Sequence, residues 1–255
     1  MSAVTLGSAL LSFCVFAAIF SPLERLLPRR RAAWLRPALG TDLLFLAGNF
    51  LVWSPLVDSI LSMALRFAGS AASVAARLYE LPLVARLVRA WLTVDLCTYW
   101  FHRLSHRLPW LWRFHRVHHT AKHLDWVAAY REHPLDNLLT RAVENLPLLL
   151  FGLPLPLVAG VAAFRGLFAL YIHSNIQLEP GPLRFLLGSP RLHHFHHDEH
   201  HGGTVNYGNL NPLLDLLFGT YRDPGSVPPQ LGDSGRAPTN YFGLIWQPLR
   251  ETNKD

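Results

Sequence analysis

Histidine is the residue type best placed to do chemistry in this chain, because all fourteen histidines lie between His102 and His201. Most of them form three clusters, His102-x-x-x-His106, His115-x-x-His118-His119 and His193-x-x-His196-His197. Residues three and four apart share one face of a helix, so each cluster presents its imidazoles together. Neutral imidazole is the commonest metal ligand among side chains, and the eight clustered imidazoles exceed what one ion can use. The spacing predicts a site for two metal ions.

The ligand type narrows the identity of the metal. An imidazole-rich shell suits iron, zinc, copper or nickel. Cys14 and Cys97 both lie in apolar stretches, so a structural zinc site with thiolate ligands is not indicated. Because the chain is apolar, as described below, its substrate is expected to be apolar too, and unactivated C–H bonds require O₂ chemistry at a redox metal. Zinc has no redox chemistry. We therefore expect two Fe ions, with O₂ as co-substrate.

One carboxylate is spaced to support this centre. Asp95 precedes His102 by seven residues, which is two helical turns, and therefore lies on the same face. Ionisable residues inside apolar segments are usually functional, and metal-bound histidines commonly donate their second N–H to a carboxylate. We expect Asp95 to hydrogen-bond a histidine ligand; the alternative is a role in helix packing.

The elements that must position the histidines are apolar. Hydrophobic residues make up 51% of the chain and charged residues only 16%. Four apolar stretches, each close to the ~20 residues that a helix needs to cross a bilayer, run from Val4 to Phe20, Leu43 to Leu65, Leu81 to Phe101 and Leu146 to Ile172. The sequence predicts an all-α, polytopic membrane protein with about three transmembrane helices, a helical hairpin and a cytoplasmic histidine-box helical cap.

The positions of the arginines predict the orientation of the chain. No basic residue precedes the first apolar stretch, whereas Arg25, Arg29 and Arg36 follow it, the reverse of a cleavable signal peptide. Cytoplasmic loops are enriched in Lys and Arg, so this loop is expected inside. Two further crossings return the chain inside at His102. The histidines are therefore expected to face the cytoplasm, at a bacterial inner membrane.

The last apolar stretch needs a hairpin rather than a single crossing. A single crossing would separate the third histidine cluster from the first two. Gly152, Pro154 and Pro156 interrupt the stretch, and proline breaks or kinks a helix. We therefore predict a membrane hairpin over 146–172. It falls within a catalytic region, 102–222, that follows N-terminal spans, 1–101, and precedes a C-terminal tail, 223–255, all in one structural domain.

At this point an ordered set of motifs resembles a known family. From Asp95 to Tyr221 the chain is similar to the fatty acid hydroxylase/sterol desaturase superfamily, through Asp95-x-x-x-Tyr99-Trp100-x-His102-Arg103-x-x-His106, Trp112-x-x-His115-x-x-His118-His119, Arg131-x-His133-Pro134, His173-Ser174-Asn175, Pro190-x-x-His193-x-x-His196-His197, Asn206-Tyr207-Gly208 and Leu217-Phe218-Gly219-Thr220-Tyr221. The resemblance implies a membrane di-iron oxygenase that hydroxylates or desaturates a lipid, sterol or other apolar substrate. Such an enzyme uses O₂ and two electrons from a separate donor, a ferredoxin or cytochrome-type protein with its reductase.

The resemblance also implies a ligand set. The eight clustered histidines match the family's metal ligands, His173 would be a ninth, and His133 falls on a family position as well. For His133 the alternative is to cap the turn before Pro134. The sequence has no G-x-G-x-x-G fingerprint, so no bound nucleotide is expected.

Two other functions are compatible with clustered histidines. One is a histidine-rich membrane metal transporter, although transporters commonly carry their histidines in low-complexity loops. The other is a zinc-dependent lipid hydrolase, for which no carboxylate general base is obvious. The formal charge of +6 does not indicate nucleic-acid binding, because the basic residues flank apolar stretches and no nucleic-acid-reading motif is present.

Overall fold

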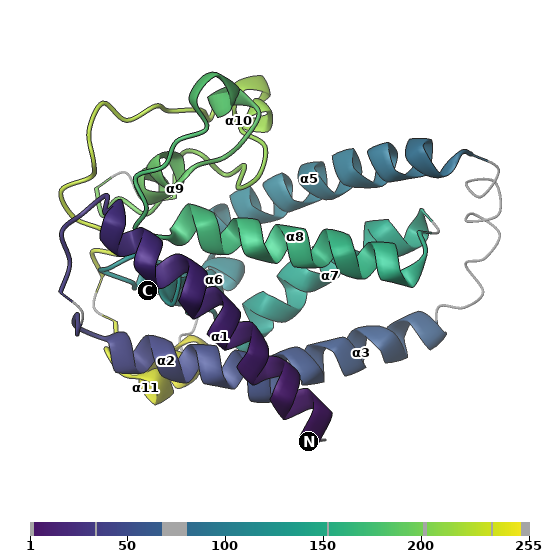
Figure 1. Cartoon of the computed structure of the whole chain (residues 1–255), viewed down its shortest axis with the longest axis horizontal. Coiled ribbons are helices and arrows are strands. Elements are labelled where there is room, and N and C mark those ends of the chain that lie inside the picture. Colours follow the sequence, from purple (N-terminus) through teal and green to yellow (C-terminus); the bar gives the residue numbers. More distant parts are fainter. Residues whose placement is uncertain are drawn as a thin grey trace.

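The computed structural model describes residues 3–33, 35–67, 81–151, 153–200, 203–235 and 237–250. Over these residues the chain is helical and contains no strand, as predicted, with two isolated β-bridges, between Pro28 and Ile176 and between Asp198 and Leu231 (Figure 1). The elements are α1 (Ala3–Leu26), α2 (Leu39–Gly48), η1 (Asn49–Trp53), α3 (Ser54–Phe67), α5 (Leu83–Arg107), α6 (Pro109–His119), η2 (Ala128–Tyr130), α7 (Pro134–Leu150), α8 (Leu155–His173), η3 (Gly181–Phe185), α9 (Pro190–His196), α10 (Leu213–Leu217) and α11 (Tyr241–Arg250).

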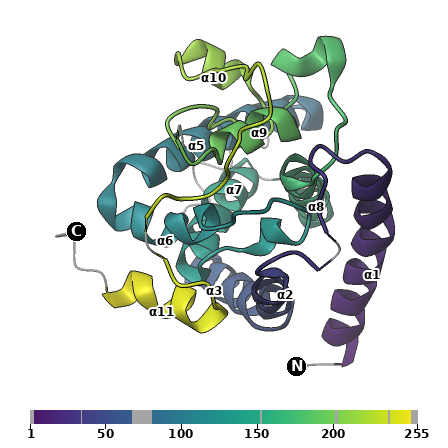
Figure 2. The ribbon, with the colours of Figure 1, turned by 90° about the vertical axis from the view of Figure 1, so that its left-hand side faces the viewer.

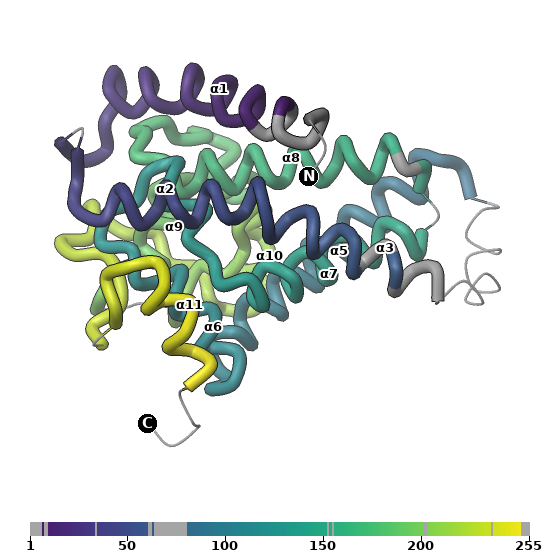
Figure 3. Tube along the Cα trace, turned by 90° about the horizontal axis from the view of Figure 1, so that it is seen from below, coloured from purple at the N-terminus to yellow at the C-terminus, as the bar shows by residue number. Residues whose placement is uncertain are grey.

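Two helical segments among these residues are long and apolar enough to cross a membrane, Leu39–Ile60 and Pro156–His173. The first of them covers α2, the π-helical turn η1 and the start of α3, which follow one another in line (Figure 3). The other two apolar stretches also form helices, α1 and α5, of 24 and 25 residues. This is consistent with a membrane protein, while the number of crossings and the three-region division stay predictions. Residues 68–80 and 251–255 of those regions lie outside the described residues.

The predicted hairpin is formed by α7 and α8. The two helices contact each other, α7 packs along α5, and the turn between α7 and α8 lies at the opposite end from α9 (Figures 1 and 2). Pro154 precedes α8 and Pro156 lies in its first turn, so the prolines mark the turn. Gly152 lies outside the described residues. The hairpin therefore returns the chain to the end of the molecule where the other histidines lie.

The hairpin begins earlier than the sequence predicts. Its first arm starts at Pro134 and not at Leu146. The difference arises because α7 carries charged and amide side chains over its first three turns, including Asp136, Arg141 and Glu144, and a search for apolar stretches assigns such residues to a loop. In the structure these side chains line an internal cavity.

Two clusters of apolar side chains hold this frame together. Near the histidines, Phe20 of α1 and Leu170 of α8 pack with Trp126 and Ile176. Toward the hairpin turn, Val94 of α5 packs against apolar side chains of α7, of α8 and of the turn between them, Leu148, Leu153, Val158 and Val161. Many other leucines are exposed along α1, α2 and α5, as expected for helices in contact with lipid.

Candidate metal centre

The histidines come together at the ends of four helices. His102 and His106 lie in the last turns of α5, His115 to His119 end α6, His173 ends α8, and the third cluster occupies α9 and its C-cap. Local sequence fixes where two of these helices begin: Pro109 lies in the first turn of α6, and the Ser189 side chain accepts the Leu192 N–H ahead of Pro190 in α9. The ends of α5, α6, α8 and α9, which are separated in sequence, thus bring their histidines together.

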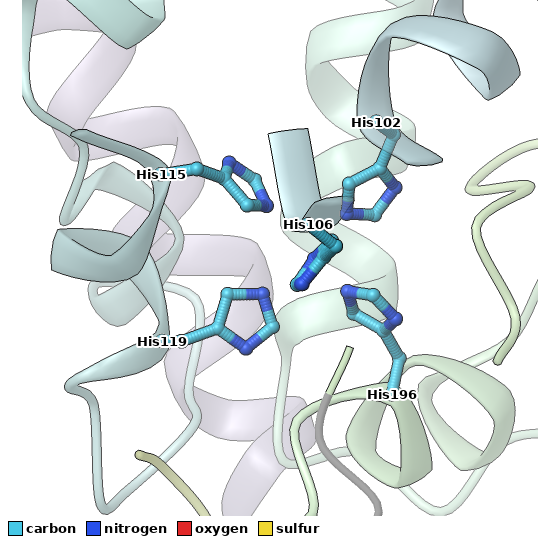
Figure 4. Close-up of side chains that lie close together, drawn as sticks. All are labelled: His102, His106, His115, His119 and His196. Carbon is cyan, nitrogen blue, oxygen red and sulfur yellow. The ribbon is translucent and has the colours of Figure 1, made fainter. Parts of the chain in front are cut away.

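Nine histidines form two groups. In the first group the ligand atoms all lie within 4.8 Å of one another and the rings surround a common point (Figure 4); its members are His102, His106, His115, His119 and His196. The second group meets the same distance criterion and consists of His118, His173, His193 and His197. Each adjacent pair, His118–His119 and His196–His197, is divided between the groups, so the groups are neighbours; the His119 and His197 rings stack with centroids 4.2 Å apart.

In the second group the nitrogen positions require a cation. His118 donates its Nδ1–H to the Arg131 carbonyl at 3.2 Å, and His173 donates its own to the Ala169 carbonyl at 2.7 Å. A neutral imidazole then carries a lone pair on Nε2. Yet the Nε2 atoms of His118 and His173 lie 2.9 Å apart, with one lone pair facing the other. The Nε2 of His193, whose Nδ1 has no hydrogen-bond partner, lies 2.8 Å from His173 Nε2. Facing lone pairs repel unless a positive ion lies between them, so these residues fit a metal.

The imidazole nitrogens of the first group also fit a metal ion, although here the observation is unpartnered Nε2 atoms. His102, His196 and His115 donate Nδ1–H to the Tyr207 carbonyl, the Val205 carbonyl and the Asp136 carboxylate, at 2.9, 2.7 and 3.0 Å. These hydrogen bonds leave Nε2 as the free lone pair. In this group four Nε2 atoms are buried without a hydrogen-bond partner, those of His115 and His196 and also those of His106 and His119. Because a buried unsatisfied polar atom costs ~1–3 kcal/mol, metal ligation is the reading that accounts for all four.

Burial also keeps the imidazoles outside the candidate membrane-spanning helices neutral. Burial and, secondarily, the neighbouring imidazoles lower the pKa of His118, His119, His193 and His197 well below the usual value. Burial lowers the pKa of His196 to about 3. Only a neutral imidazole can ligate a metal, so these side chains are ready to bind at neutral pH.

A glycine next to the first group is required by its packing. Gly203 has a φ of +70°, and a Cβ built there would lie 2.0 Å from Nδ1 of His106. The loop after the third cluster therefore closes over His106 only because this position has no side chain.

Two predicted site residues lie elsewhere. Asp95 Oδ1 accepts a hydrogen bond at 2.5 Å from Arg165 of α8, so the structure joins it to the hairpin and not to a histidine, the packing alternative. His133 caps α7: its Nδ1 accepts the Leu135 N–H, and its Nε2 lies 3.1 Å from the Ile245 carbonyl oxygen. With both ring nitrogens engaged, His133 belongs to neither group.

The carboxylate contact expected of Asp95 is made by Asp136. The sequence offers one signal for Asp136, its position two residues after Pro134, in the first turn of α7. That signal does not say in which direction the helix points. The remaining described histidines support the site or lie apart from it. His194 is fully buried with its Nε2 3.2 Å from the His173 carbonyl oxygen, whereas His200 is exposed. His201 lies outside the described residues.

A cavity of about 510 Å³ reaches both groups. The histidines in its wall are His102, His115, His118, His173 and His193. Its other walls include α7, α8, η1, the middle of α1 and part of α5. A molecule bound in this cavity would contact both groups.

The amino-acid sequence is similar to those of several known proteins. Ornithine lipid hydroxylase OlsE of Rhizobium tropici is 31% identical over 170 residues, which cover 66% of this chain and 51% of that protein. Human alkylglycerol monooxygenase is 32% identical over 137 residues, 52% of this chain and 29% of that protein. Mouse lathosterol oxidase is 30% identical over 150 residues, 58% of this chain and 46% of that protein.

The chain thus spans about half the length, or less, of these curated relatives. No solved structure matches it. A family model described as fatty acid hydroxylase matches residues 87–220, more than half of the chain and almost the stretch that carries the motifs. The resemblance found in the sequence is confirmed, and the chain belongs to the fatty acid hydroxylase family.

Proposed function

We propose that this chain is a membrane-bound di-iron oxygenase that hydroxylates or desaturates a lipid, using O₂ and two electrons from a separate donor. The observation that carries the proposal is the pair of adjacent groups of buried imidazoles, with Nε2 lone pairs that fit metal ions and a cavity that reaches both. The names of the relatives support a lipid or sterol as substrate.

The residues have separate tasks in this proposal. One iron would be held by the five histidines of the first group and the other by the four of the second. When bound, the iron pair supplies activation of O₂ and oxidation of a C–H bond. The protein fixes five of the imidazoles through Nδ1 hydrogen bonds, those of His102, His115, His118, His173 and His196. It excludes water from the others by burial; His119, His193 and His197 are at most 4% exposed.

The overall reactions balance with the same reductant. In hydroxylation one C–H bond breaks, one oxygen atom enters the product, and the other leaves as water with two electrons and two protons. In desaturation two neighbouring C–H bonds break and, with the same two electrons and two protons, both oxygen atoms leave as water. An external donor is needed in both.

A basic pocket near the second group is suited to that donor. The pocket has a volume of about 710 Å³, and five cations line it, Arg25, Arg30, Arg31, Arg36 and Lys122, against the acids Glu24, Asp125 and Glu199. Its arginine loop is hydrogen-bonded to the segment after His173, since the Arg29 N–H donates to the Asn175 carbonyl at 3.0 Å. An acidic ferredoxin or cytochrome-type protein would be steered to this face. We place the face, with the histidines, on the cytoplasmic side of a bacterial inner membrane.

The first test is the metal content of detergent-purified protein from iron-supplemented cells. We expect iron in both groups, loss of iron in the His118→Ala, His119→Ala double variant, and normal iron in His200→Ala, which alters an exposed histidine. Lipid products should form only with O₂. Zinc in place of iron with O₂-independent turnover would favour a hydrolase, and metal-dependent uptake into proteoliposomes would favour a transporter.

A further inference from the structure

The cavity beside the histidines has a polar wall, which is unexpected for a site that oxidises hydrocarbon. Six polar side chains of α7 line it, at positions one and four residues apart that share one helix face: Asp136, Asn137, Thr140, Arg141, Glu144 and Asn145. At 1.5 Å per residue this polar face runs roughly 13 Å along the cavity. It starts at the metal centre, because Asp136 hydrogen-bonds His115.

The opposite wall has the reverse character. On α8 the cavity is lined mostly by small and apolar residues, among them Ala159, Ala162, Ala163 and Gly166, and Phe16 of α1 and Phe50 of η1 also line it. The charged exception on α8 is Arg165, whose guanidinium is paired with Asp95 at 2.5 Å. A Cβ built on Gly166 would meet no atom within 4 Å. The cavity therefore offers one polar side and one apolar side along its length, which matches an amphiphile lying lengthwise.

The polar wall keeps hydrogen-bonding capacity in reserve. Asn137 donates to Glu132 at 2.7 Å, but its Oδ1 is buried without a hydrogen-bond partner. Farther along, Arg141 pairs with Asp58 at 3.3 Å and Glu144 with Arg165 at 3.5 Å, and both distances are long for charged partners. An alkyl chain against this wall would leave these groups desolvated and unsatisfied, which is unfavourable, whereas a polar group would satisfy them.

We propose that the cavity binds the polar, zwitterionic headgroup of a lipid along α7, next to the metal centre, with the hydrocarbon against α8. The charges support a zwitterion, because Arg141 and Glu144 present opposite signs three residues apart in the same wall. A headgroup of one sign would face a like charge. The oxidised carbon is then in the headgroup or close to it, and not in the middle of a chain. This inference rests on the proposed function for its chemistry but not for its binding test.

The binding test compares three amphiphiles with the same C16 chain, lysophosphatidylethanolamine, palmitic acid and hexadecanol, added to the purified protein and followed by native mass spectrometry. We expect the zwitterionic lipid to bind at least about tenfold more tightly than hexadecanol, a factor that corresponds to ~1.4 kcal/mol. The Asn137→Leu, Thr140→Val double variant should lose this preference. Thr93→Val, the same change on an exposed part of α5, should keep it.

Equal binding of hexadecanol, or a preference that survives the double variant, would overturn the inference. Neither result depends on iron or O₂, so the binding test can fail while the oxygenase proposal stands, and the reverse. Tandem mass spectrometry of lipids from expressing cells gives a second check. We expect the added oxygen or the lost hydrogens in fragments that contain the headgroup or its nearest carbons; modification far along a chain would contradict the inference.

Discussion

The two histidine groups differ in what holds their imidazoles in place. In the first group His115 is fixed by the Asp136 carboxylate of α7, and His106 packs against Gly203 in a loop. In the second group the supports are main-chain carbonyls: Arg131 accepts from His118, and Ala169 of the same helix accepts from His173. The first group therefore depends on one carboxylate and on the loop that carries Gly203, Val205 and Tyr207, whereas the second depends on main-chain carbonyls at the end of η2 and in α8. Substitutions should separate the two.

The largest effect on metal binding is expected from Gly203→Ala. The new methyl group would collide with His106, so the first group should lose its metal while the second keeps it. Elemental analysis of the purified variant measures this. Gly219→Ala is the matched control, because its φ of +71° is nearly the same as that of Gly203 but no atom lies within 4 Å of its Cβ. Equal metal loss in both variants would attribute the effect to backbone strain.

A smaller effect is expected from Asp136→Asn. The amide keeps the shape but removes the charge that orients His115 and raises its basicity, and such second partners are worth ~10–100-fold in metal affinity. Chelator competition should show this loss at the first group alone, with the second group as internal reference. Uniform weakening of both would show that the groups share their support.

Asp42→Asn probes the second group and should act more weakly. Asp42 is fully buried; it accepts a hydrogen bond from Arg131 at 2.5 Å and forms an ion pair with Arg36 at 2.7 Å. Arg131 in turn presents its carbonyl to His118. Because the effect passes through Arg131, we expect second-group affinity to fall less than ~10-fold, the lower end for direct partners. Asp58→Asn, at a mostly exposed aspartate, is the control. First-group loss in the Asp42 variant would contradict the assignment.

Asp95→Asn should leave metal binding unchanged. Asp95 pairs with Arg165 inside the helical frame and contacts no histidine ring among the described hydrogen bonds. The substitution therefore takes from a buried guanidinium its close charge partner and leaves it the longer pair with Glu144, at 3.5 Å. Such a change costs about 3–5 kcal/mol of stability. Thermal unfolding with metal analysis on the same sample tests this. A loss of iron without a loss of stability would restore Asp95 to the metal centre.

These residues show what helical spacing can and cannot predict. The spacing within each cluster predicts that its histidines lie on one face of a helix, because the geometry of a helical turn is local. The same spacing places Asp95 on the face of α5 that carries His102. It carries no information on which side chain of a neighbouring helix contacts Asp95, and that side chain is Arg165 of α8. The contact between Asp136 and His115 could not be predicted from spacing, because it depends on how α7 packs against α6.

The hairpin gives the same lesson at the level of an element. Pro154 and Pro156 located its turn, because proline acts on its own helix. Most of its first arm lies outside the predicted bounds of 146–172, because the polar face of α7 lowers the hydropathy of a helix whose polar side chains line a cavity. Hydropathy assumes that polar residues face water, and a polar cavity breaks that assumption.

The third histidine cluster is fastened by chain that is synthesised after it. Gly232 donates its N–H to the His197 carbonyl at 2.9 Å, Glu199 donates to the Gln230 carbonyl at 3.1 Å, and Leu244 of α11 packs on Val117 of α6. During synthesis, all nine histidines therefore emerge from the ribosome before residues 230–232, which hydrogen-bond the segment that contains His197. The site for iron would then be complete only after residues 230–232 have been synthesised, and until then the exposed histidines could bind another metal.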